Sequence, residues 1–176
     1  VAVPGDPARA DGLLGTPTVV AGNANVFNTA TDTIVTIAGT SAVINWVPTD
    51  NAAGAAPIDF LPVNRNAFFQ ADNNFTVLNR VLTPMTRAIG LNGQIFGTIF
   101  NGAVGTTGGN IFFYSPTGIV MGANSVIVAG GVILTADDIL FTPGPAGGIA
   151  LSPSGAIQFR GAAGSQASVV MDPGAQ

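Results

Sequence analysis

Short runs of β-branched and aromatic residues recur along most of the chain, and Gly, Asn, Asp and Pro separate them. Such runs predict short strands and an all-β fold. The predicted strands are Thr33–Ile37, Ala42–Val47, Ile58–Leu61, Phe75–Val81, Gln94–Phe100, Asn110–Tyr114, Ile119–Met121, Ser125–Ala129, Val132–Leu134, Ile149–Leu151, Ala156–Phe159 and Ser168–Met171. Because Gly is frequent and Glu and Lys are absent, a single turn over Pro84–Ile89, ended by Gly90, is the most helix we expect.

The breaks between the runs distinguish two all-β architectures. A sandwich or antiparallel barrel joins strands by two-residue hairpin turns, and Asp11-Gly12, Asn92-Gly93 and Asn101-Gly102 fit that pattern. Most breaks are instead a single Gly or a corner such as Ser115-Pro116-Thr117-Gly118. Corners of this kind between very short strands are typical of a β-solenoid, in which each coil turns sharply and stacks on the last.

A sequence repeat favours the solenoid. Residues 113–119 (FYSPTGI) match residues 150–156 (ALSPSGA) at an offset of 37 residues, and a Gly-Ala corner and a short strand follow each copy. Solenoid coils often take about 20 residues, so the offset predicts two coils between the copies. The alternative is that two unrelated Ser-Pro turns coincide.

Composition excludes most catalytic and binding classes. Of 176 residues only 5 are basic, all Arg, and 9 are acidic, all Asp, for a net charge of -4. Without His or Cys there is no ordinary zinc site, Cys nucleophile, Ser-His-Asp triad or disulfide, and without Lys there is no P-loop or Schiff base. Five scattered Arg argue against a nucleic-acid surface. We therefore expect no enzyme, no metal and no cofactor.

Neither a targeting segment nor a membrane segment is visible. The chain starts Val1-Ala2-Val3-Pro4, and its longest nearly unbroken apolar run, Val126–Leu134, is far shorter than the ~20 residues of a membrane helix. Low charge with abundant Asn, Thr, Gly, Ala and Val resembles exported surface proteins, so we expect a secreted or bacterial cell-surface protein whose signal peptide is cleaved. A cytosolic protein is the alternative. So few charges also protect poorly against self-association.

Five segments, in order, resemble one family. They are Ala42–Trp46 (AVINW), Val77–Val81 (VLNRV), Leu91–Phe96 (LNGQIF), Ser115–Ile119 (SPTGI) and Gly130–Ile139 (GGVILTADDI). The stretch from about Ile34 to Ile139 thereby resembles the haemagglutination-activity domain of two-partner-secretion exoproteins, the N-terminal secretion domain of filamentous-haemagglutinin-like adhesins. The family has NPNGI where this chain has Ser115 and Thr117. Both replacements keep a side-chain oxygen that can bond the turn backbone, and both lose the amide donor. The chain has no good counterpart of the family's NPNL; Ala71–Phe75 is the nearest segment.

The resemblance implies a right-handed parallel β-helix with an N-terminal cap and short extra-helical hairpins. We divide the chain into an extended arm or cap over 1–22 and one β-helix domain over 23–176. The resemblance also implies export by the general secretory route, recognition by an outer-membrane pore of the Omp85 type, and folding outside the cell, where the domain seeds the β-helix that follows. The residues that it implicates are Asn45, Trp46, Asn79, Arg80, Asn92, Gly93, Ser115, Pro116, Gly118 and Ile119.

Charged residues outside these motifs have a functional and an ordinary interpretation. Asp137-Asp138 could bind calcium or act in acid–base catalysis, as in β-helix polysaccharide lyases, but a solvated turn is the ordinary interpretation. The Arg side chains could form an anion site, or be isolated charges and single pairs with Asp59 or Asp72. Arg80, beside Asn79, could anchor a loop or cap by hydrogen bonds. The Arg residues concerned are Arg65, Arg80, Arg87 and Arg160.

Aromatic residues and the N-terminus carry similar alternatives. Trp46 either stacks on a ligand or fills the interface between the cap and the first coils. Phe68-Phe69 and Phe112-Phe113 place adjacent rings on opposite strand faces, so one ring of each pair is covered by an extra layer or contacts a neighbouring subunit. Val1–Gly22 either adds a strand to a neighbour's sheet or is a docked or disordered terminus.

Three functions are compatible with these observations. The first is a non-enzymatic, exported β-helix domain of a surface adhesin or fibre, with an outer-membrane pore as its partner. The second is a subunit that self-associates into an extracellular filament, because the bare end of a solenoid exposes unpaired backbone groups. The third, a carbohydrate-active β-helix enzyme, is disfavoured by the residue inventory. No membrane insertion is expected.

Overall fold

The computed structural model describes residues 11–82, 86–143, 149–150 and 157–176, and no helix occurs in them. The all-β prediction is therefore confirmed for the described part of the chain. Its strands are β1 (Gly15–Asn28), β2 (Asp32–Pro48), β3 (Ile58–Leu61), β4 (Asn66–Ala71), β5 (Thr76–Val81), β6 (Ile89–Leu91), β7 (Gln94–Asn101), β8 (Val104–Thr107), β9 (Asn110–Tyr114), β10 (Ile119–Met121), β11 (Val126–Val128), β12 (Gly131–Thr135), β13 (Asp138–Ile139), β14 (Thr142–Pro143), β15 (Ile149–Ala150), β16 (Phe159–Arg160) and β17 (Val169–Met171).

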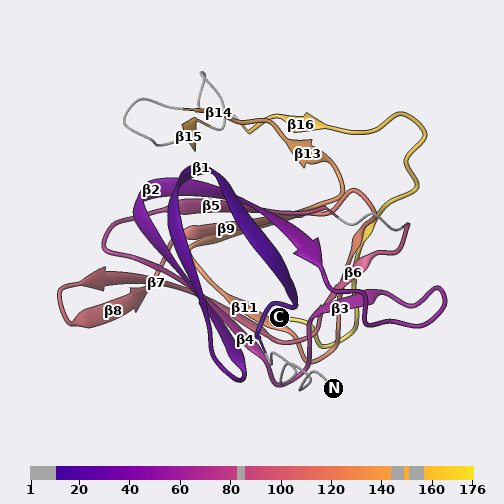
Figure 1. The fold of residues 1–176 in the computed structure, drawn as a ribbon, viewed down its shortest axis with the longest axis horizontal. Coiled ribbons are helices and arrows are strands. Elements are labelled where there is room, and N and C mark those ends of the chain that lie inside the picture. Colours follow the sequence, from indigo (N-terminus) through magenta and orange to yellow (C-terminus); the bar gives the residue numbers. More distant parts are fainter. Residues whose placement is uncertain (1–10, 83–85, 144–148, 151–156) are drawn as a thin grey trace, which may run out of the picture.

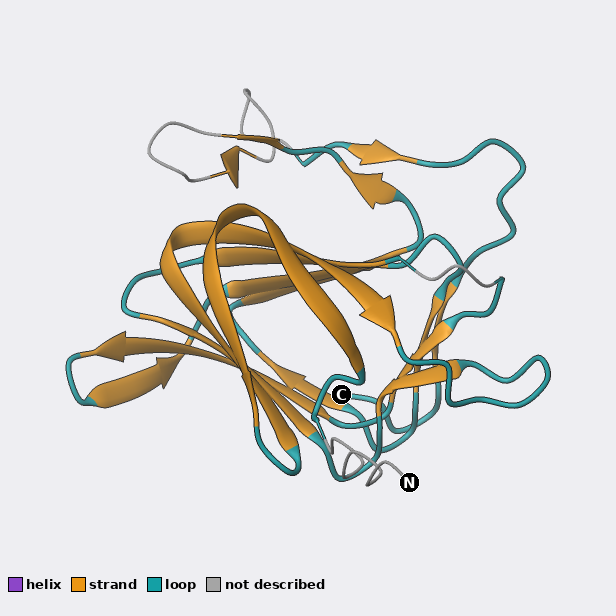
Figure 2. Cartoon of the chain, viewed as in Figure 1, coloured by secondary structure: helices purple, strands orange, loops and turns teal. Residues whose placement is uncertain are grey.

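Three ladders of parallel strands organise the molecule (Figure 1). The first ladder is β2–β4–β7–β11, the second is β2–β5–β9–β12, and the third is β3–β6–β10–β17. The long strand β2 serves two ladders, because Asp32–Thr36 pairs with β4 and Ser41–Trp46 pairs with β5. The chain thus visits the first, second and third ladder in that order in each of four passes. The outcome is a set of curled, mostly parallel sheets shaped like a half-barrel (Figure 2).

Neighbouring passes lie further apart in sequence than we expected. Asp32 pairs with Asn66 and Thr76 pairs with Asn110, and each of these pairs is separated by 34 residues. The expected coil of about 20 residues is wrong for these steps, because each pass holds three strands and the long connections between them. The repeat seen in the sequence does not mark a ladder step either: Ile119 pairs with Val169, and residues 151–156 of the second copy lie outside the described residues.

The core follows from the alternation of side chains along each strand. In β4, Ala67, Phe69 and Ala71 are buried while Asn66, Phe68 and Gln70 are only partly buried, as the two-residue period of a strand requires. Inward residues from all three ladders form one continuous cluster that includes Trp46, Phe60, Phe75 and Phe113. Its large rings meet edge to face, Trp46 against Phe60 and Phe69 against Phe113.

A second, smaller cluster lies on the outer face of the second ladder. Val43, Leu78, Phe112 and Ile133 stand in register there on four neighbouring strands. Ile139, Phe141 and Ile157 pack against this row from outside. The extra covering layer expected for Phe112-Phe113 is therefore present, since Phe113 faces the main core and Phe112 faces the second cluster.

The N-terminal segment pairs within its own chain. Strand β1 runs antiparallel to β2 from Gly15↔Pro48 to Asn28↔Thr33, with two irregularities. It was not among the predicted strands, and it crosses the boundary that we placed at residue 22. Gly15–Gly22 therefore adds to the sheet of its own molecule, while residues 1–10 of the expected arm lie outside the described residues.

The turn predictions had mixed outcomes. Asn101-Gly102 does lie at an antiparallel hairpin, that of β7 and β8, whose two turn residues are Gly102 and Ala103. Asn92-Gly93 instead joins β6 to β7, which belong to different ladders, and Asp11-Gly12 precedes β1. Of the expected helical turn over Pro84–Ile89, residues 84–85 lie outside the described part, Thr86 and Arg87 form a bend, and Ile89 begins β6.

Candidate functional site

The first candidate group is a buried joint between Trp46 of β2 and Asn79 of β5. The indole Nε1–H of Trp46 donates to Asn79 Oδ1 at 3.0 Å, and Asn79 Nδ2 donates to the carbonyl oxygen of Phe112 at 3.3 Å. Trp46 and Asn79 are both fully buried. A buried amide with partners on either side links three successive strands of the second ladder. Trp46 thus fills the core rather than offering a platform to a ligand.

Arg80 lies on the opposite face of the same strand. Its Nε and Nη2 donate to the two oxygens of Asp138 at 3.2 and 2.8 Å, and its Nη1 donates to Asn45 Oδ1 at 3.3 Å. The guanidinium also lies 5.8 Å from the ring centres of both Tyr114 and Phe141. A bidentate pair of this geometry is stronger and more directional than a single contact. Arg80 thus fastens Asp138 of β13 to the second ladder by hydrogen bonds, which is the kind of anchoring contact considered for it above.

Tyr114 lies beside this ion pair in the next strand of the ladder. Burial raises the pKa of its phenol above the ordinary value of 10.0, and the negative charges of Asp138 and Asp137 raise it further, while Arg80 lowers it. The phenol is therefore neutral at physiological pH. It contributes packing and a hydrogen-bonding group rather than a charge.

The Asn92-Gly93 segment forms a corner between the third and first ladders. The backbone N–H groups of Asn92 and Gly93 donate to the Leu61 carbonyl oxygen at 2.7 and 3.1 Å, and Asn92 Nδ2 donates to Asp59 Oδ1 at 2.7 Å. Gly93 is required by close packing, because a β-carbon there would collide with the carbonyl oxygen of Arg65. The corner thus fastens one pass onto the preceding one.

The Ser115–Ile119 segment forms the equivalent corner between the second and third ladders. Ser115 is buried, and its carbonyl oxygen accepts from the Gly118 N–H at 3.1 Å, which closes a turn. Gly118 has φ +101°, a conformation that favours glycine. The Ser115 and Thr117 hydroxyls, which replace two family asparagines, lie 3.1 Å apart and bond each other. Pro116 is exposed at the tip of the turn.

The candidate residues thus share a structural task. Polar side-chain bonds between successive passes span 33 to 35 residues, as in Trp46–Asn79, Asn45–Arg80 and Asp59–Asn92. Asp32–Asn66, Thr36–Gln70 and Thr76–Asn110 form further bonds of this kind. The structure does not gather the ten implicated residues into one surface site. It distributes them along the joints, where most are buried.

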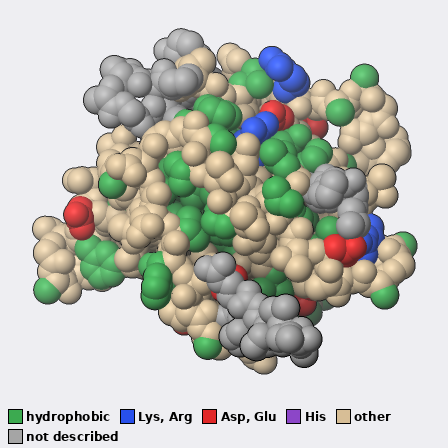
Figure 3. Space-filling view, viewed as in Figure 1, with side chains coloured by type: hydrophobic (Ala, Val, Ile, Leu, Met, Phe, Trp, Pro, Cys, Tyr) green, Lys and Arg blue, Asp and Glu red, His purple; other side chains and the backbone are tan. Residues whose placement is uncertain are grey.

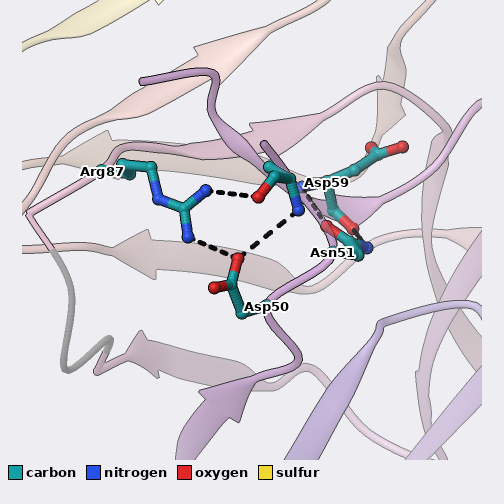
Figure 4. A network of polar contacts seen from close by, with 5 residues as sticks. Asp50, Asn51, Asp59 and Arg87 are labelled. Carbon is teal, nitrogen blue, oxygen red and sulfur yellow. Dashed lines mark hydrogen bonds and ion pairs between the residues drawn. The ribbon is translucent and has the colours of Figure 1, made fainter. Parts of the chain in front are cut away.

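The remaining Arg candidates bond separate partners. Arg87 bonds Asp50 and the Ala52 carbonyl oxygen, and Asn51 exchanges two hydrogen bonds of 3.0 Å with the Asp59 backbone (Figure 4). Arg65 donates to the carbonyl oxygens of Asp11 and Ala30. The expected pairs with Asp59 or Asp72 are therefore wrong for Arg80 and Arg87, whose partners are Asp138 and Asp50.

The exposed surface carries few charges. On the face shown in Figure 3, blue and red side chains are sparse among apolar and uncharged polar ones. Arg65, Arg80 and Arg87 bond different partners, so they do not form the anion patch considered above, and Arg160 lies on β16 in register with Asp138, the partner of Arg80. Among the described residues, no group of three acidic, His or Cys side chains could hold a metal ion, and no helix has the length and apolar character needed to cross a bilayer.

The sequence analysis did not predict two features of the structure. One is the ion pair between Arg80 and Asp138, which are 58 residues apart. The other is an open apolar pocket of about 390 Å³ at the end of the fourth pass. Its lining residues are Met121, Ile127, Val132, Leu134, Val169, Met171 and Gln176. The dense apolar run Val126–Leu134 was the sequence signal for this pocket.

No family model matches the chain, and no curated protein is significantly similar to it.

Proposed function

We propose that the chain is a non-enzymatic, exported right-handed parallel β-helix domain of the two-partner-secretion type, which serves as the secretion and folding module of a bacterial surface adhesin or fibre. The observation that supports this most is where the family-like segments lie. Ala42–Trp46 and Val77–Val81 are neighbours in one ladder, while Leu91–Phe96 and Ser115–Ile119 contain the corners that fasten one pass to the next. The constant order of ladders supports the proposal, because the coils of a β-helix would repeat in this way.

Burial of these segments constrains how a pore partner would recognise them. Trp46, Asn79, Gly93 and Ser115 are buried in the folded chain, and of the Ser115–Ile119 corner only Pro116 is exposed. An outer-membrane pore of the Omp85 type would therefore bind these residues before the chain folds. Such an order suits a domain that crosses the pore unfolded and acquires its coils outside.

The end of the fourth pass supports a seeding role. Strands β11, β12 and β17 each have one parallel neighbour in a ladder. Gln176 continues the pattern past β11, because its N–H donates to the Ser125 carbonyl oxygen at 3.0 Å and its carbonyl oxygen accepts from the Ile127 N–H at 2.8 Å. A strand edge of this kind above an apolar pocket is a template for a further coil.

The test is pore-dependent secretion. The chain, fused to a secretory signal peptide, would be expressed in a Gram-negative host with and without the Omp85-type pore that the proposal predicts in the neighbouring gene. We expect the chain in the medium only when the pore is present, and in the periplasm otherwise. Equal amounts in the medium with and without the pore, or retention in the periplasm despite the pore, would contradict the proposal.

A matched pair of variants tests whether the family-like segment guides export. Arg80→Gln changes a family-like residue, whereas Arg65→Gln changes an Arg outside those segments that bonds two backbone carbonyl oxygens. We expect Arg80→Gln to reduce secretion severalfold more than Arg65→Gln. If the two variants are secreted equally although both are produced, the family-like segment does not guide export.

A self-assembling filament subunit is the second candidate function. The end of the fourth pass also favours this function, because apolar side chains are exposed there. Met171 is 56% exposed, Val170 is 46% exposed and Val132 is 41% exposed. Size-exclusion chromatography and negative-stain electron microscopy of the purified chain discriminate the two. Filaments that Met171→Asp abolishes would support assembly through this end, whereas a compact monomer would exclude the filament and leave the secretion module.

A further inference from the structure

The fourth pass differs from the first three in one connection. The second ladder is joined to the third by residues 49–57, 82–88 and 115–118 in the first three passes. In the fourth pass, the much longer segment 136–168 separates β12 from β17. The described parts of this connection do not extend the ladders. They fold back over the outer face of the second ladder (Figure 1).

We call residues 137–141 and 157–160 the strap. Its two strands β13 and β16 pair through only Asp138↔Arg160 and Ile139↔Phe159. So short a ladder has little stability of its own. The strap therefore depends on its contacts with the body, where Ile139, Phe141 and Ile157 cover the row of Val43, Leu78 and Phe112.

Arg80 and Asp138 provide the polar part of this docking. Their side chains are 19% and 26% exposed, so water screens the ion pair only in part. Asn45 holds the guanidinium from one side, and Tyr114 and Phe141 flank it. The pair thus joins the second pass of the body to the connection of the fourth, with Asn45 of the first pass and Tyr114 of the third beside it.

We propose that the ion pair between Arg80 and Asp138, which we call the latch, holds the strap on the body and thereby positions β17, the strand of the third ladder in the fourth pass. On its N-terminal side, segment 161–168 separates β17 from the body when the strap is docked, and the whole of segment 136–168 separates it when the strap is undocked. The undocked tether is roughly four times as long, and loop closure scales with the 3/2 power of length, so docking raises the effective concentration of β17 at β10 about eightfold. Arg80 and Asp138 are in this sense positioning residues, and the inference does not depend on the route of export.

Hydrogen exchange measured by mass spectrometry tests this inference. Asp138→Asn removes the charge while keeping the shape of the side chain, and Asp137→Asn is the matched control at an exposed neighbouring carboxylate. In Asp138→Asn we expect faster exchange in the strap and also in β17, the latter by up to about eightfold. Strand β7, which pairs with β4, β8 and β11 and with neither the strap nor β17, should keep its exchange rate.

A second variant guards against a folding defect. Ile157→Ala removes an apolar contact of the strap and changes no ladder strand. It should give the same pattern, with the fluorescence of the buried Trp46 unchanged. Faster exchange of the strap with β17 unaltered in either variant would overturn the coupling. An unaltered strap in Asp138→Asn would overturn the latch.

Discussion

At the residue scale, Asn79 shows how the interior accommodates polar groups. It is fully buried, yet its amide accepts from Trp46 and donates to the Phe112 carbonyl oxygen. Every buried side-chain nitrogen or oxygen among the described residues has such a partner. A buried group that loses its partner keeps its desolvation cost. Breaking one of these joints therefore lowers the free energy of unfolding more than breaking an exposed pair does.

Replacing Asn79 should reveal this cost. We expect Asn79→Ala to lower the free energy of unfolding by about 3 kcal/mol, because it leaves the Trp46 indole N–H unpaired in the core. Urea unfolding followed by the fluorescence of Trp46, the sole Trp, measures the change. The exposed Asn73→Ala should alter stability by less than about 0.5 kcal/mol. A loss below about 1 kcal/mol in Asn79→Ala would show that the joint is not stabilising.

Tyr114 predicts a pH dependence at the same scale. Burial, and then Asp138, raise its pKa in the folded chain above the unfolded value of 10.0. The folded state thus holds the proton more tightly. Its contribution to stability is complete below pH 10.0 and is lost as the pH rises through the folded pKa. Because Tyr114 is the sole Tyr, phenolate absorbance reports it alone. Identical titration curves in buffer and in urea would contradict this prediction.

At the scale of elements, local pattern predicts some strands and not others. Ile58–Leu61, Asn110–Tyr114 and Ile119–Met121 have the predicted bounds. The adjacent rings of Phe68 and Phe69 conceal the alternation of β4, whose inward neighbours are small Ala residues. Strand β1 is rich in Gly, Asn and Thr, and it is fixed by pairing with β2 rather than by its own propensity.

The two rings of β4 provide a test of this alternation. Phe69 is fully buried against Phe113, whereas Phe68 stacks on Phe96 at 5.3 Å on the outer face. We expect Phe69→Ala to cost about 4 kcal/mol of unfolding free energy and Phe68→Ala about 1 kcal/mol. Urea unfolding of the two variants gives both values. Equal losses would show that β4 does not alternate between core and surface as described.

At the scale of the whole molecule, sequence alone predicts where the passes join but not how long each pass is or which distant residues meet. The family-like segments identify where passes meet, and they do so from local residues. The length of a pass, the partner of Arg80 and the fold-back of the strap depend on contacts between residues far apart in the chain, such as Asp32 with Asn66 and Arg80 with Asp138. Such contacts have no local signal, so a sequence pattern of short strands fits short and long coils equally well.

The stacking of passes is the central claim, and cysteine pairs test it most directly. The chain has no native Cys. Thr36, Gln70 and Thr98 stand in register on β2, β4 and β7, and Gln70 Nε2 donates to Thr36 Oγ1 at 3.1 Å. Neighbouring strands lie about 4.8 Å apart, within disulfide range, whereas alternate strands lie about 9.6 Å apart.

Mild oxidation of three double-Cys variants would give the order of the strands. We predict disulfides in Thr36→Cys/Gln70→Cys and in Gln70→Cys/Thr98→Cys, and none in Thr36→Cys/Thr98→Cys. A disulfide in the third variant, or its absence in the first two, would contradict the stacking of each pass on the preceding one, on which the account rests.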